Sequence, residues 1–506
     1  MDRNAFRTYA QEHGGRVAVL FLLFLLALYV FYSAGFGIFA IICTLPIIVP
    51  ITVATFHYRM LAFWVLITIN YLVIWKDFPS IGIPTSLFNE AIEILLLVLA
   101  IIDIKNSHFE RIGNIMFFTL IIWCGFCTLE MLNDTCGIGI DIGRWYPVAR
   151  SLAFQVMYAF LVFTIYISSP KILSSYLIIW AALALFASFW TWKQIYLGFS
   201  DAEKQFLNGI GGTTHIIQGG TLIRYFSVYS DAANFGIGIA STAVAFSIFG
   251  ITTKINKLRL FYIATAIICI WAMFQSGTRT AVASLLAGLI AYIFLSKSFK
   301  IAIPFSILFV SFVFFLAFTR IGHGNQQIRR MRSAFDRNDA SAKGRSESQE
   351  NMKKYLKEAP WGIGMAVGAK NVPANNKYTF MATVAPDSEY VFIWIHTGII
   401  GITIFLICTF IMLAGACWIV FFTLKSPSLR GIGAGFCCAM VSQQVGGYGN
   451  QVLMQFPNCL VFYGGLTIVY VLPYLEKEWI EYEAQQLAKQ EEKKRLKLEK
   501  KLTSRV

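Results

Sequence analysis

Charged residues are scarce in this sequence, and the patterns typical of a soluble protein are missing. Charged side chains make up 14% of the chain and hydrophobic ones 57%, with a mean hydropathy of +0.63. A soluble chain of this length needs far more polar surface, so most of this surface must face lipid. The hydrophobic runs do not alternate polar and apolar residues, which excludes the strands of a membrane β-barrel.

The sequence also lacks recognisable signal-peptide, nucleic-acid-binding and metal-binding patterns, which excludes several classes of function. We recognise no cleavable signal peptide, because the first hydrophobic run begins at about Val17 and continues into a second one, so we expect a signal anchor. No nucleic-acid motif surrounds the basic residues, although the formal net charge is +15. We therefore predict no nucleic-acid partner and attribute the charge to membrane orientation and anionic lipid. No His, Cys or Asp cluster has the spacing of metal ligands, so we predict no metal and no cofactor.

Hydrophobic runs of about 20 residues recur along the whole chain, which is the length of a membrane-spanning helix. They predict an all-α fold, a polytopic helical integral membrane protein with about 12–14 transmembrane helices. The candidate spans lie near residues 17–34, 36–54, 60–75, 88–102, 114–131, 151–168, 172–192, 233–250, 260–276, 280–296, 301–318, 400–422, 431–448 and 457–473.

Lysines and arginines in the short loops predict the orientation. With the N-terminus in the cytoplasm, the inside loops carry Arg59, Lys105, Arg111, Lys171, Lys254, Lys257, Arg259, Lys297, Lys300, Lys425 and Arg430. The lysine-rich C-terminal tail also falls inside, where its last turns can lie on anionic headgroups. Segments 132–150, about 193–232 and about 319–399 then lie outside.

This pattern divides the chain into five segments. We predict N-terminal transmembrane helices over 1–219, central helices with arginine motifs over 220–318, and one large periplasmic loop over 319–399. C-terminal helices follow over 400–475, and a charged cytoplasmic tail occupies 476–506.

Part of the large loop has the pattern of a helix. In "GRSESQENMKKYLKEAPWGIG", Ser346 and Gln349 have the spacing of a capping box, which predicts that the helix begins there. Met352 and Leu356 share one helical face, and Pro360 ends the helix. Residues 387–398 predict a second helix that leads into the next span.

Three arginines on the outer side lie at or just before helix starts. They are Arg224, Arg279 and Arg345. Free N–H groups at a helix start and a guanidinium can face one anion, so the set indicates a phosphate or pyrophosphate ligand. The alternative is that each arginine independently extends toward the membrane interface.

Four segments, in this order, resemble motifs of the O-antigen ligase and O-antigen polymerase superfamily of bacterial membrane enzymes. Arg224 with the following "SVYSDAANFG" resembles the family's arginine segment before a middle span, and "SGTRTAVASLLAG" resembles its Ser-x-x-Arg element, which contains Arg279. "GRSESQENMKKYLKEAPWGIG" resembles the Gly-Arg, helix and Pro-x-Gly-x-Gly sequence of the large loop, and "DSEYVFIWIHTGIIG" resembles the element that ends it. The resemblance covers roughly residues 220–475.

The family's loop histidine falls on Asp387 when positions are counted back from Gly398. The resemblance therefore implies Asp387 as the group that orients the acceptor hydroxyl and takes its proton, with Glu389 as a neighbouring substitute. The alternative is that Asp387 caps the following helix. Because members acting as ligases carry the histidine, its replacement favours a polymerase over a ligase.

The resemblance implies a glycosyltransferase that moves a saccharide from undecaprenyl pyrophosphate to a sugar hydroxyl at the periplasmic face of the bacterial inner membrane. Arg224, Arg279 and Arg345 would bind the pyrophosphate and stabilise its departing charge. The reaction would be inverting and metal-independent, and the acceptor would be another glycan or a lipid A-core in surface polysaccharide or lipopolysaccharide biosynthesis.

Two other classes stay open at this point. A transporter or flippase of lipid-linked glycans would use charged residues deep in its spans, and Glu93 in the fourth span is the best such residue. A membrane scaffold without chemistry would leave the three arginines unexplained.

Overall fold

The structure is a computed structural model of the chain. It describes residues 58–72, 86–209, 211–217, 222–296, 299–322, 324, 326–332, 340–384 and 387–503, with Gly15, Leu22, Leu26 and Tyr29. The chain divides into two compact units, Met1–Trp64 and Val65–Val506. The predicted spans near 17–34 and 36–54 lie outside the described residues.

Helices occupy every other predicted span. They are α3 (Arg59–Leu72), α4 (Ser86–Ile102), α5 (Ile115–Leu129), α6 (Ile142–Ala149) with α7 (Gln155–Tyr166), α8 (Pro170–Tyr196), α11 (Ala232–Thr252), α12 (Asn256–Gln275), α13 (Arg279–Leu295), α14 (Phe299–Phe318), α18 (Glu389–Trp418), α19 (Pro427–Gly449) and α20 (Asn458–Thr503). In the described part of the chain, strands comprise only β1 (Ile216–Ile217) and β2 (Leu222–Ile223), paired antiparallel with Ile216 opposite Ile223. The all-α fold class is confirmed.

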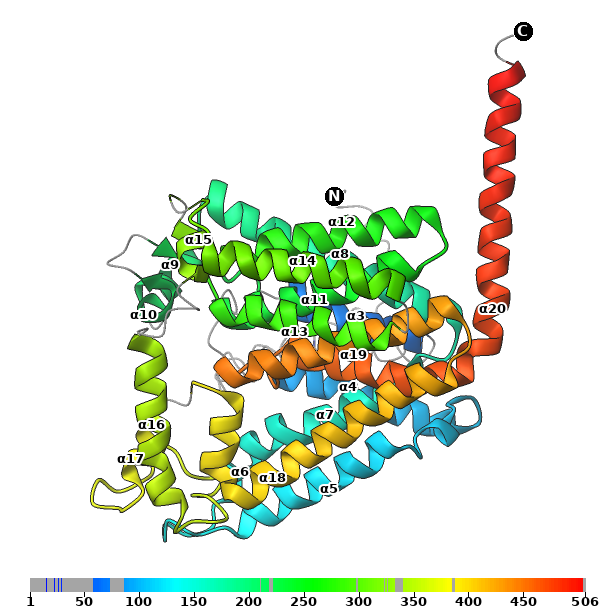
Figure 1. Ribbon diagram of the computed structural model, residues 1–506. Helices are drawn as coiled ribbons and strands as arrows, with labels where there is room; N and C mark the ends of the chain where they lie inside the picture. Colours follow the sequence, from blue (N-terminus) through cyan, green and yellow to red (C-terminus); the bar gives the residue numbers. More distant parts are fainter. Residues whose placement is uncertain are drawn as a thin grey trace. The chain divides into compact units, whose positions relative to one another are not determined.

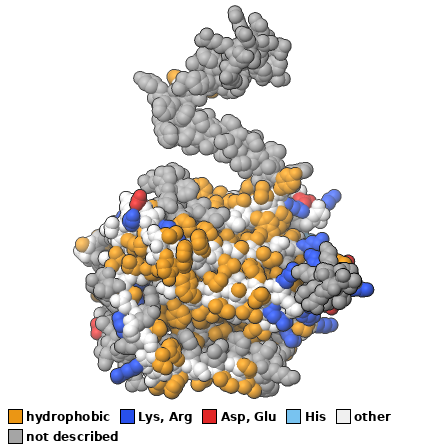
Figure 2. Space-filling model, turned by 90° about the horizontal axis from the view of Figure 1, so that it is seen from above, with side chains coloured by type: hydrophobic (Ala, Val, Ile, Leu, Met, Phe, Trp, Pro, Cys, Tyr) orange, Lys and Arg blue, Asp and Glu red, His pale blue; other side chains and the backbone are white. Residues whose placement is uncertain are grey.

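Seven of the described helical segments are long and apolar enough to cross a membrane, and Arg59–Tyr71 and Arg279–Leu295 are shorter apolar helices. Figure 2 shows one face of the molecule, on which hydrophobic side chains fill the middle and charged ones lie toward two opposite edges. This distribution suits a bundle that is surrounded by lipid at mid-height and by headgroups at its ends. The chain is therefore a polytopic membrane protein, while the count of 12–14 spans and the five-segment division stay predictions.

The bundle has two chemically different ends. We call the end where α12 stops and α13 begins the arginine end, and the end where α11 stops and α12 begins the tail end. Figure 1 shows the loop helices α9, α10, α15, α16 and α17 gathered at the arginine end, whereas α20 leaves the bundle at the tail end. The loops that we predicted to lie outside thus share one end, as the orientation argument requires.

The helix α19 lies at the centre of the packing, in contact with α11, α13, α18 and α20. Its sequence "GIGAGFCCAMVSQQVGGYG" supplies small residues that let backbones approach closely, as is common between membrane helices. A Cβ on Gly435 would overlap the ring of Phe249, and one on Gly446 would overlap Ile237. Phe249 in turn packs against Trp180 and Phe436, so this contact belongs to a close-packed aromatic core.

The loops at the arginine end contain short helices. They are η3 (Glu130–Leu132), α9 (Asp201–Asn208), α10 (Gly212–His215), α15 (Gln326–Arg332), α16 (Ala340–Leu356) and α17 (Thr379–Thr383). At the tail end, η1 (Ile104–Asn106) and η2 (Phe109–Arg111) join α4 to α5. The remaining elements are two π-helical turns, η4 (Arg150–Phe154) within α6–α7 and η6 (Ile419–Thr423) after α18.

Two boundary predictions are wrong. The outer segment expected over 132–150 is helical from Ile142, because the carboxylate of Asp141 accepts a hydrogen bond from the backbone N–H of Arg144 and caps the helix early. The loop helix α16 begins at Ala340 and not at Ser346, so Ser346 and Gln349 lie inside it and form no capping box. The alanines and lysine before Ser346 are good helix formers, which favours the earlier start.

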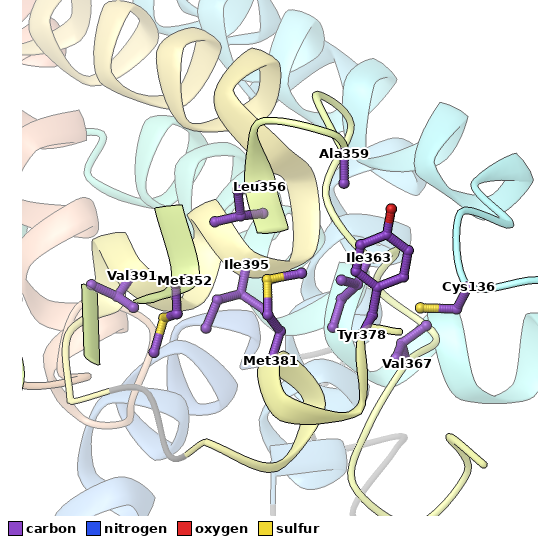
Figure 3. Close-up of a cluster of buried hydrophobic side chains, with 10 residues drawn as sticks. All are labelled: Cys136, Met352, Leu356, Ala359, Ile363, Val367, Tyr378, Met381, Val391 and Ile395. Carbon is purple, nitrogen blue, oxygen red and sulfur yellow. The ribbon is translucent and has the colours of Figure 1, made fainter. Parts of the chain in front are cut away.

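The large loop has a hydrophobic core of its own, built from residues that are far apart in the sequence. Figure 3 shows Met352 and Leu356 of α16 beside Val391 and Ile395 of α18, and all four are buried. Cys136, Ala359, Ile363, Val367, Tyr378 and Met381 complete the cluster. The predicted shared face of Met352 and Leu356 is confirmed, and it ties the loop to the start of α18.

Gly435→Ala tests the close packing of α19. The added methyl group meets the Phe249 ring, so we expect the free energy of unfolding to fall by about 1–3 kcal/mol. The measurement is the thermal unfolding midpoint of the purified protein in detergent. Gly125→Ala in α5 is the control, since no atom lies within 4 Å of a Cβ there. Equal midpoints for the two variants would contradict the packing argument.

Candidate functional site

A tight turn joins α12 to α13 at the arginine end. Gly277 has φ +58°, a left-handed conformation that favours glycine, and Thr278 occupies the N-cap position before Arg279. Ser276 stabilises the turn, because its hydroxyl donates to the carbonyl of Met273 (2.7 Å) and accepts from the backbone N–H of Thr278 (3.2 Å). The turn therefore fixes the position from which Arg279 projects.

Three hydrogen bonds hold the guanidinium of Arg224, and two of them go to this turn. Its guanidinium donates to the hydroxyl of Thr278 (2.9 Å), the carbonyl of Ser276 (3.4 Å) and the carbonyl of Thr214 (2.9 Å). The Thr278 hydroxyl also donates to the carbonyl of Ala232 at the start of α11 (2.9 Å). The predicted arginines at 224 and 279 are thus brought together, although 55 positions separate them in the sequence.

A third arginine reaches the same turn. The Nε of Arg330, in α15, donates a short hydrogen bond to the carbonyl of Gly277. A Cβ on Gly277 would lie 3.2 Å from the Cγ of Arg224 and 3.5 Å from the Cδ of Arg330, so the two side chains meet over this glycine. The sequence analysis did not single out Arg330, because nothing in the sequence indicated that α15 packs against α13.

Arg345 occupies a different position from the one expected. It lies inside α16 rather than immediately before the helix, and its side chain is outside the described part of the structure. In the described structure, the side chains that meet over Gly277 are those of Arg224 and Arg330, and Arg279 follows two residues later in the chain.

The support for Arg224 comes from α9, outside the spans. The carboxylate of Glu203 accepts hydrogen bonds from Trp190, Lys193 and Gln194, and the Gln194 amide nitrogen also donates to the carbonyl of Ser227 (3.2 Å). Burial alone would raise the pKa of Glu203, but these bonds and the backbone N–H of Ser200 hold it below its usual range. Glu203 is therefore charged at neutral pH, and through Gln194 it supports Ser227, three residues after Arg224.

The two predicted acids at the start of α18 lie in different environments. Asp387 is exposed, and Ser388 occupies the N-cap position, so the capping alternative for Asp387 is not what the structure has. Glu389 is 3% exposed, and its carboxylate accepts the backbone N–H of Leu453 (3.1 Å). Asp387 can reach a ligand, whereas Glu389 holds the loop that joins α19 to α20.

The end of α19 connects both halves of this site. The side-chain amide of Asn450 donates to the hydroxyl of Thr280 (2.6 Å), next to Arg279. Three residues earlier, the carbonyl of Gly447 accepts from the hydroxyl of Ser388, next to Asp387 (3.1 Å). The starts of α13 and α18 are therefore attached to the same turn of one helix, which places the arginine turn and Asp387 around a common region.

The segment "PWGIG" explains how α18 is held in place. The backbone N–H groups of Ile363 and Gly364 donate to the carbonyls of Ile395 (2.9 Å) and His396 (3.0 Å). The kink in α18 lies at Gly398, with φ 66°, where a Cβ would overlap the carbonyl oxygen of Pro360. The loop backbone thus pairs with the kinked helix, and only glycine fits at that contact.

Uncharged polar side chains fill the space between α11 and the loop after α19. Ser230 donates to Gln455, and the side-chain amide of Asn458 donates to the backbone carbonyl of Asn234 (2.9 Å). Asn234 also donates to the carbonyl of Phe456 (3.0 Å). Asn234 and Asn458 are buried, so these bonds tie α11 to the loop after α19. No periodic pattern in the sequence grouped these residues.

Within the described residues, no group of three or more His, Cys, Asp or Glu side chains could hold a metal ion. The turn around Gly277 is cationic, and Asp387 adds an exposed carboxylate at the start of α18. Such an arrangement can bind an anionic leaving group and orient a hydroxyl.

Residues 264–406 match the O-antigen ligase family. The match confirms the resemblance to the O-antigen ligase and polymerase superfamily and indicates a membrane glycan transferase of the ligase or polymerase type that acts on lipid-linked glycans. The O-antigen ligase segment includes Arg279, Arg330, Arg345, Asp387 and Glu389, whereas Arg224 precedes it. No curated protein matches the chain.

Gly398→Ala tests whether the loop is positioned by this backbone contact. The methyl group overlaps the carbonyl of Pro360 and the φ of 66° is strained for alanine, so we expect a loss of about 2–4 kcal/mol of unfolding free energy. We also expect faster proteolysis within 340–384. The control is Gly137→Ala, which shares the positive φ but has no atom within 4 Å of the Cβ. Equal losses in the two variants would mean that strain alone matters.

Proposed function

We propose that this protein transfers a glycan from undecaprenyl pyrophosphate to a sugar hydroxyl at the arginine end of the bundle. The single observation that carries the proposal is the meeting of Arg224 and Arg330 over Gly277, two residues before Arg279. Three cations around one helix start form an anion site, and pyrophosphate is the anion that the O-antigen ligase match makes relevant.

The arginines act on the leaving group. The bond between the anomeric carbon and the pyrophosphate oxygen breaks, and negative charge grows on that oxygen as it departs. Arg224 is fixed by Thr278 and Ser276, and Arg330 by Gly277, so these groups need little reorganisation when the charge develops. This preorganisation supplies most of the catalysis, without a metal ion.

Asp387 acts on the acceptor. Its exposed carboxylate accepts a hydrogen bond from the attacking hydroxyl and takes the proton as the new glycosidic bond forms. Attack from the side opposite the pyrophosphate inverts the anomeric carbon. The Glu389 carboxylate accepts the backbone N–H of Leu453 and so holds the start of α18 against the loop after α19. Its role is therefore positioning.

The side of the membrane follows the charge pattern. Lys171, Lys254, Lys257, Lys425 and Arg430 belong to the loops at the tail end, so we assign the tail end to the cytoplasm and the arginine end to the periplasm of the bacterial inner membrane. The acceptor is another lipid-linked glycan or a lipid A-core, and Asp387 in place of the family's loop histidine favours the polymerase.

Arg330→Ala tests the pyrophosphate site at a residue that the sequence did not single out. We expect kcat/KM for a lipid-pyrophosphate glycan to fall on the order of 100-fold, as for loss of a fixed donor to a developing anion. Arg279→Ala should lower kcat/KM to a similar extent. Arg329→Ala is the matched control, since it removes the same charge one residue away and the Arg329 side chain donates to the carbonyl of Gly324 (3.4 Å). Comparable losses at 329 and 330 would point to general loop charge instead.

Asp387→Asn tests the proposed base. The amide keeps the size of the side chain but cannot take the proton, so kcat should fall about 100- to 10,000-fold with donor binding unchanged. Ser388→Ala is the neighbouring control. Full turnover of Asp387→Asn in a correctly inserted protein would remove the carboxylate from the mechanism.

The acceptor is resolved by the surface-glycan profile of a strain that lacks the protein. Glycans reduced to a single repeat on their anchor indicate a polymerase, and full-length chains retained on undecaprenyl pyrophosphate indicate a ligase. Repeats trapped on the cytoplasmic side would indicate a flippase and would overturn the transferase proposal.

One observation favours the transport alternative. Glu93 in α4 is 0% exposed, and both of its carboxyl oxygens lack a hydrogen-bond partner within the described structure, while the nearby Glu90 pairs with Arg150 (3.1 Å). A buried acid inside a membrane helix is a common mark of a proton site. Glu93→Gln separates the two functions, because glycan transfer should persist in a transferase and substrate movement should stop in a proton-driven transporter.

A further inference from the structure

A second cleft lies at the tail end, far along α12 from the arginines. Its volume is about 500 Å³, and it lies between the start of α12 and the last described turns of α20. The lining residues are Ile255, Asn256, Lys257, Gln486, Lys489, Gln490, Lys493, Lys494 and Leu496. None of them takes part in the proposed glycan transfer.

The charge of the cleft has one sign. Lys257, Lys489, Lys493 and Lys494 line it, no acid is among the lining residues, and these lysines form no ion pair in the described structure. The contrast with Lys254 is informative, because that neighbouring lysine pairs with Glu483 at 2.9 Å. A set of unpaired lysines in one cleft favours an anionic occupant.

The start of α12 adds to this preference. Its N-cap residue is Ile255, which provides no side-chain hydrogen bond to the first N–H groups of the helix. Those groups and the positive end of the helix dipole therefore belong to the same cleft as the lysines. The lysines of α20 come from one side of that helix, because Lys489 and Lys493 are four residues apart.

The location of the cleft points to lipid. Figure 1 shows α20 turning at the tail end, passing the ends of the spans and then extending beyond the bundle, and Figure 2 shows Lys and Arg side chains gathered at the corresponding edge of the hydrophobic face. This edge is the depth at which headgroups lie. Ile255 and Leu496 give the cleft apolar walls, and the amide oxygen of Gln490 is buried without a hydrogen-bond partner in the described chain.

We propose that this cleft binds the headgroup of an anionic phospholipid in the leaflet at the tail end. The phosphate lies among the four lysines and the first N–H groups of α12, and a headgroup hydroxyl, as in phosphatidylglycerol, donates to Gln490. The bound lipid fixes the last part of α20 against the start of α12. The inference is independent of glycan transfer.

The test uses the full-length protein in detergent and native mass spectrometry with phosphatidylglycerol or phosphatidylcholine. We expect preferential retention of phosphatidylglycerol, and Lys489→Gln with Lys493→Gln and Lys494→Gln should reduce that preference at least about tenfold. The control is Lys171→Gln with Lys425→Gln and Arg430→Gln, which removes equal charge at the same end outside the cleft. Lys489→Arg with Lys493→Arg and Lys494→Arg keeps the charge and should keep the preference for phosphatidylglycerol. This variant separates loss of binding from loss of folding.

Several outcomes would overturn the proposal. Equal retention of the two lipids by the wild type, or equal loss in the cleft variant and its control, would exclude a specific headgroup site. Displacement of phosphatidylglycerol by inorganic phosphate at the same concentration would assign the cleft to a free anion. Displacement by an acidic peptide such as polyglutamate at that concentration would assign it to a protein partner.

Discussion

The carbonyl of Gly277 accepts a hydrogen bond from Arg330 while Arg224 packs on the same glycine, and the geometry of the proposed site depends on this contact. Like charges repel, so guanidinium groups converge only where backbone carbonyls and hydroxyls hold them or an anion lies between them. The carbonyls of Ser276 and Gly277 and the hydroxyl of Thr278 do the holding. The helix that begins at Arg279 adds the positive end of its dipole at the same place, which suits the turn to the anion site proposed above.

The rest of the structure ties the start of α18, next to Asp387, to the same helix end as this turn. The end of α19 carries Gly447 and Asn450, which bind the first residues of α18 and α13 respectively. The "PWGIG" backbone fixes the kink of α18 at Gly398, and the loop core around Met352 and Ile395 fixes the loop. Glycine is required at several of these contacts because backbone meets backbone or a packed ring there.

Much of the fold could be predicted from the sequence, because hydrophobic runs of spanning length report helices directly. The shared face of Met352 and Leu356 and the boundary at Gly398 were also predictable from spacing. The starts of α6 and α16 were not predicted correctly. The Asp141 cap begins α6 earlier than expected, and the helix-forming residues before Ser346 begin α16 earlier. Arg224 and Arg279 stood out beside spans, but Arg330 did not, because its role depends on how α15 packs against α13. Asp387 and Glu389 both carry a carboxylate and lie two residues apart, so the sequence could not show that Asp387 is exposed and Glu389 is buried.

The most direct measurement is a cryo-electron microscopy map of the purified protein with undecaprenyl pyrophosphate bound. The account predicts pyrophosphate density over Gly277, in contact with Arg224, Arg279 and Arg330, and with Asp387 across from it. Pyrophosphate density elsewhere in the bundle, with Arg224 and Arg330 still hydrogen-bonded to the turn and no ligand at Arg279, would contradict it.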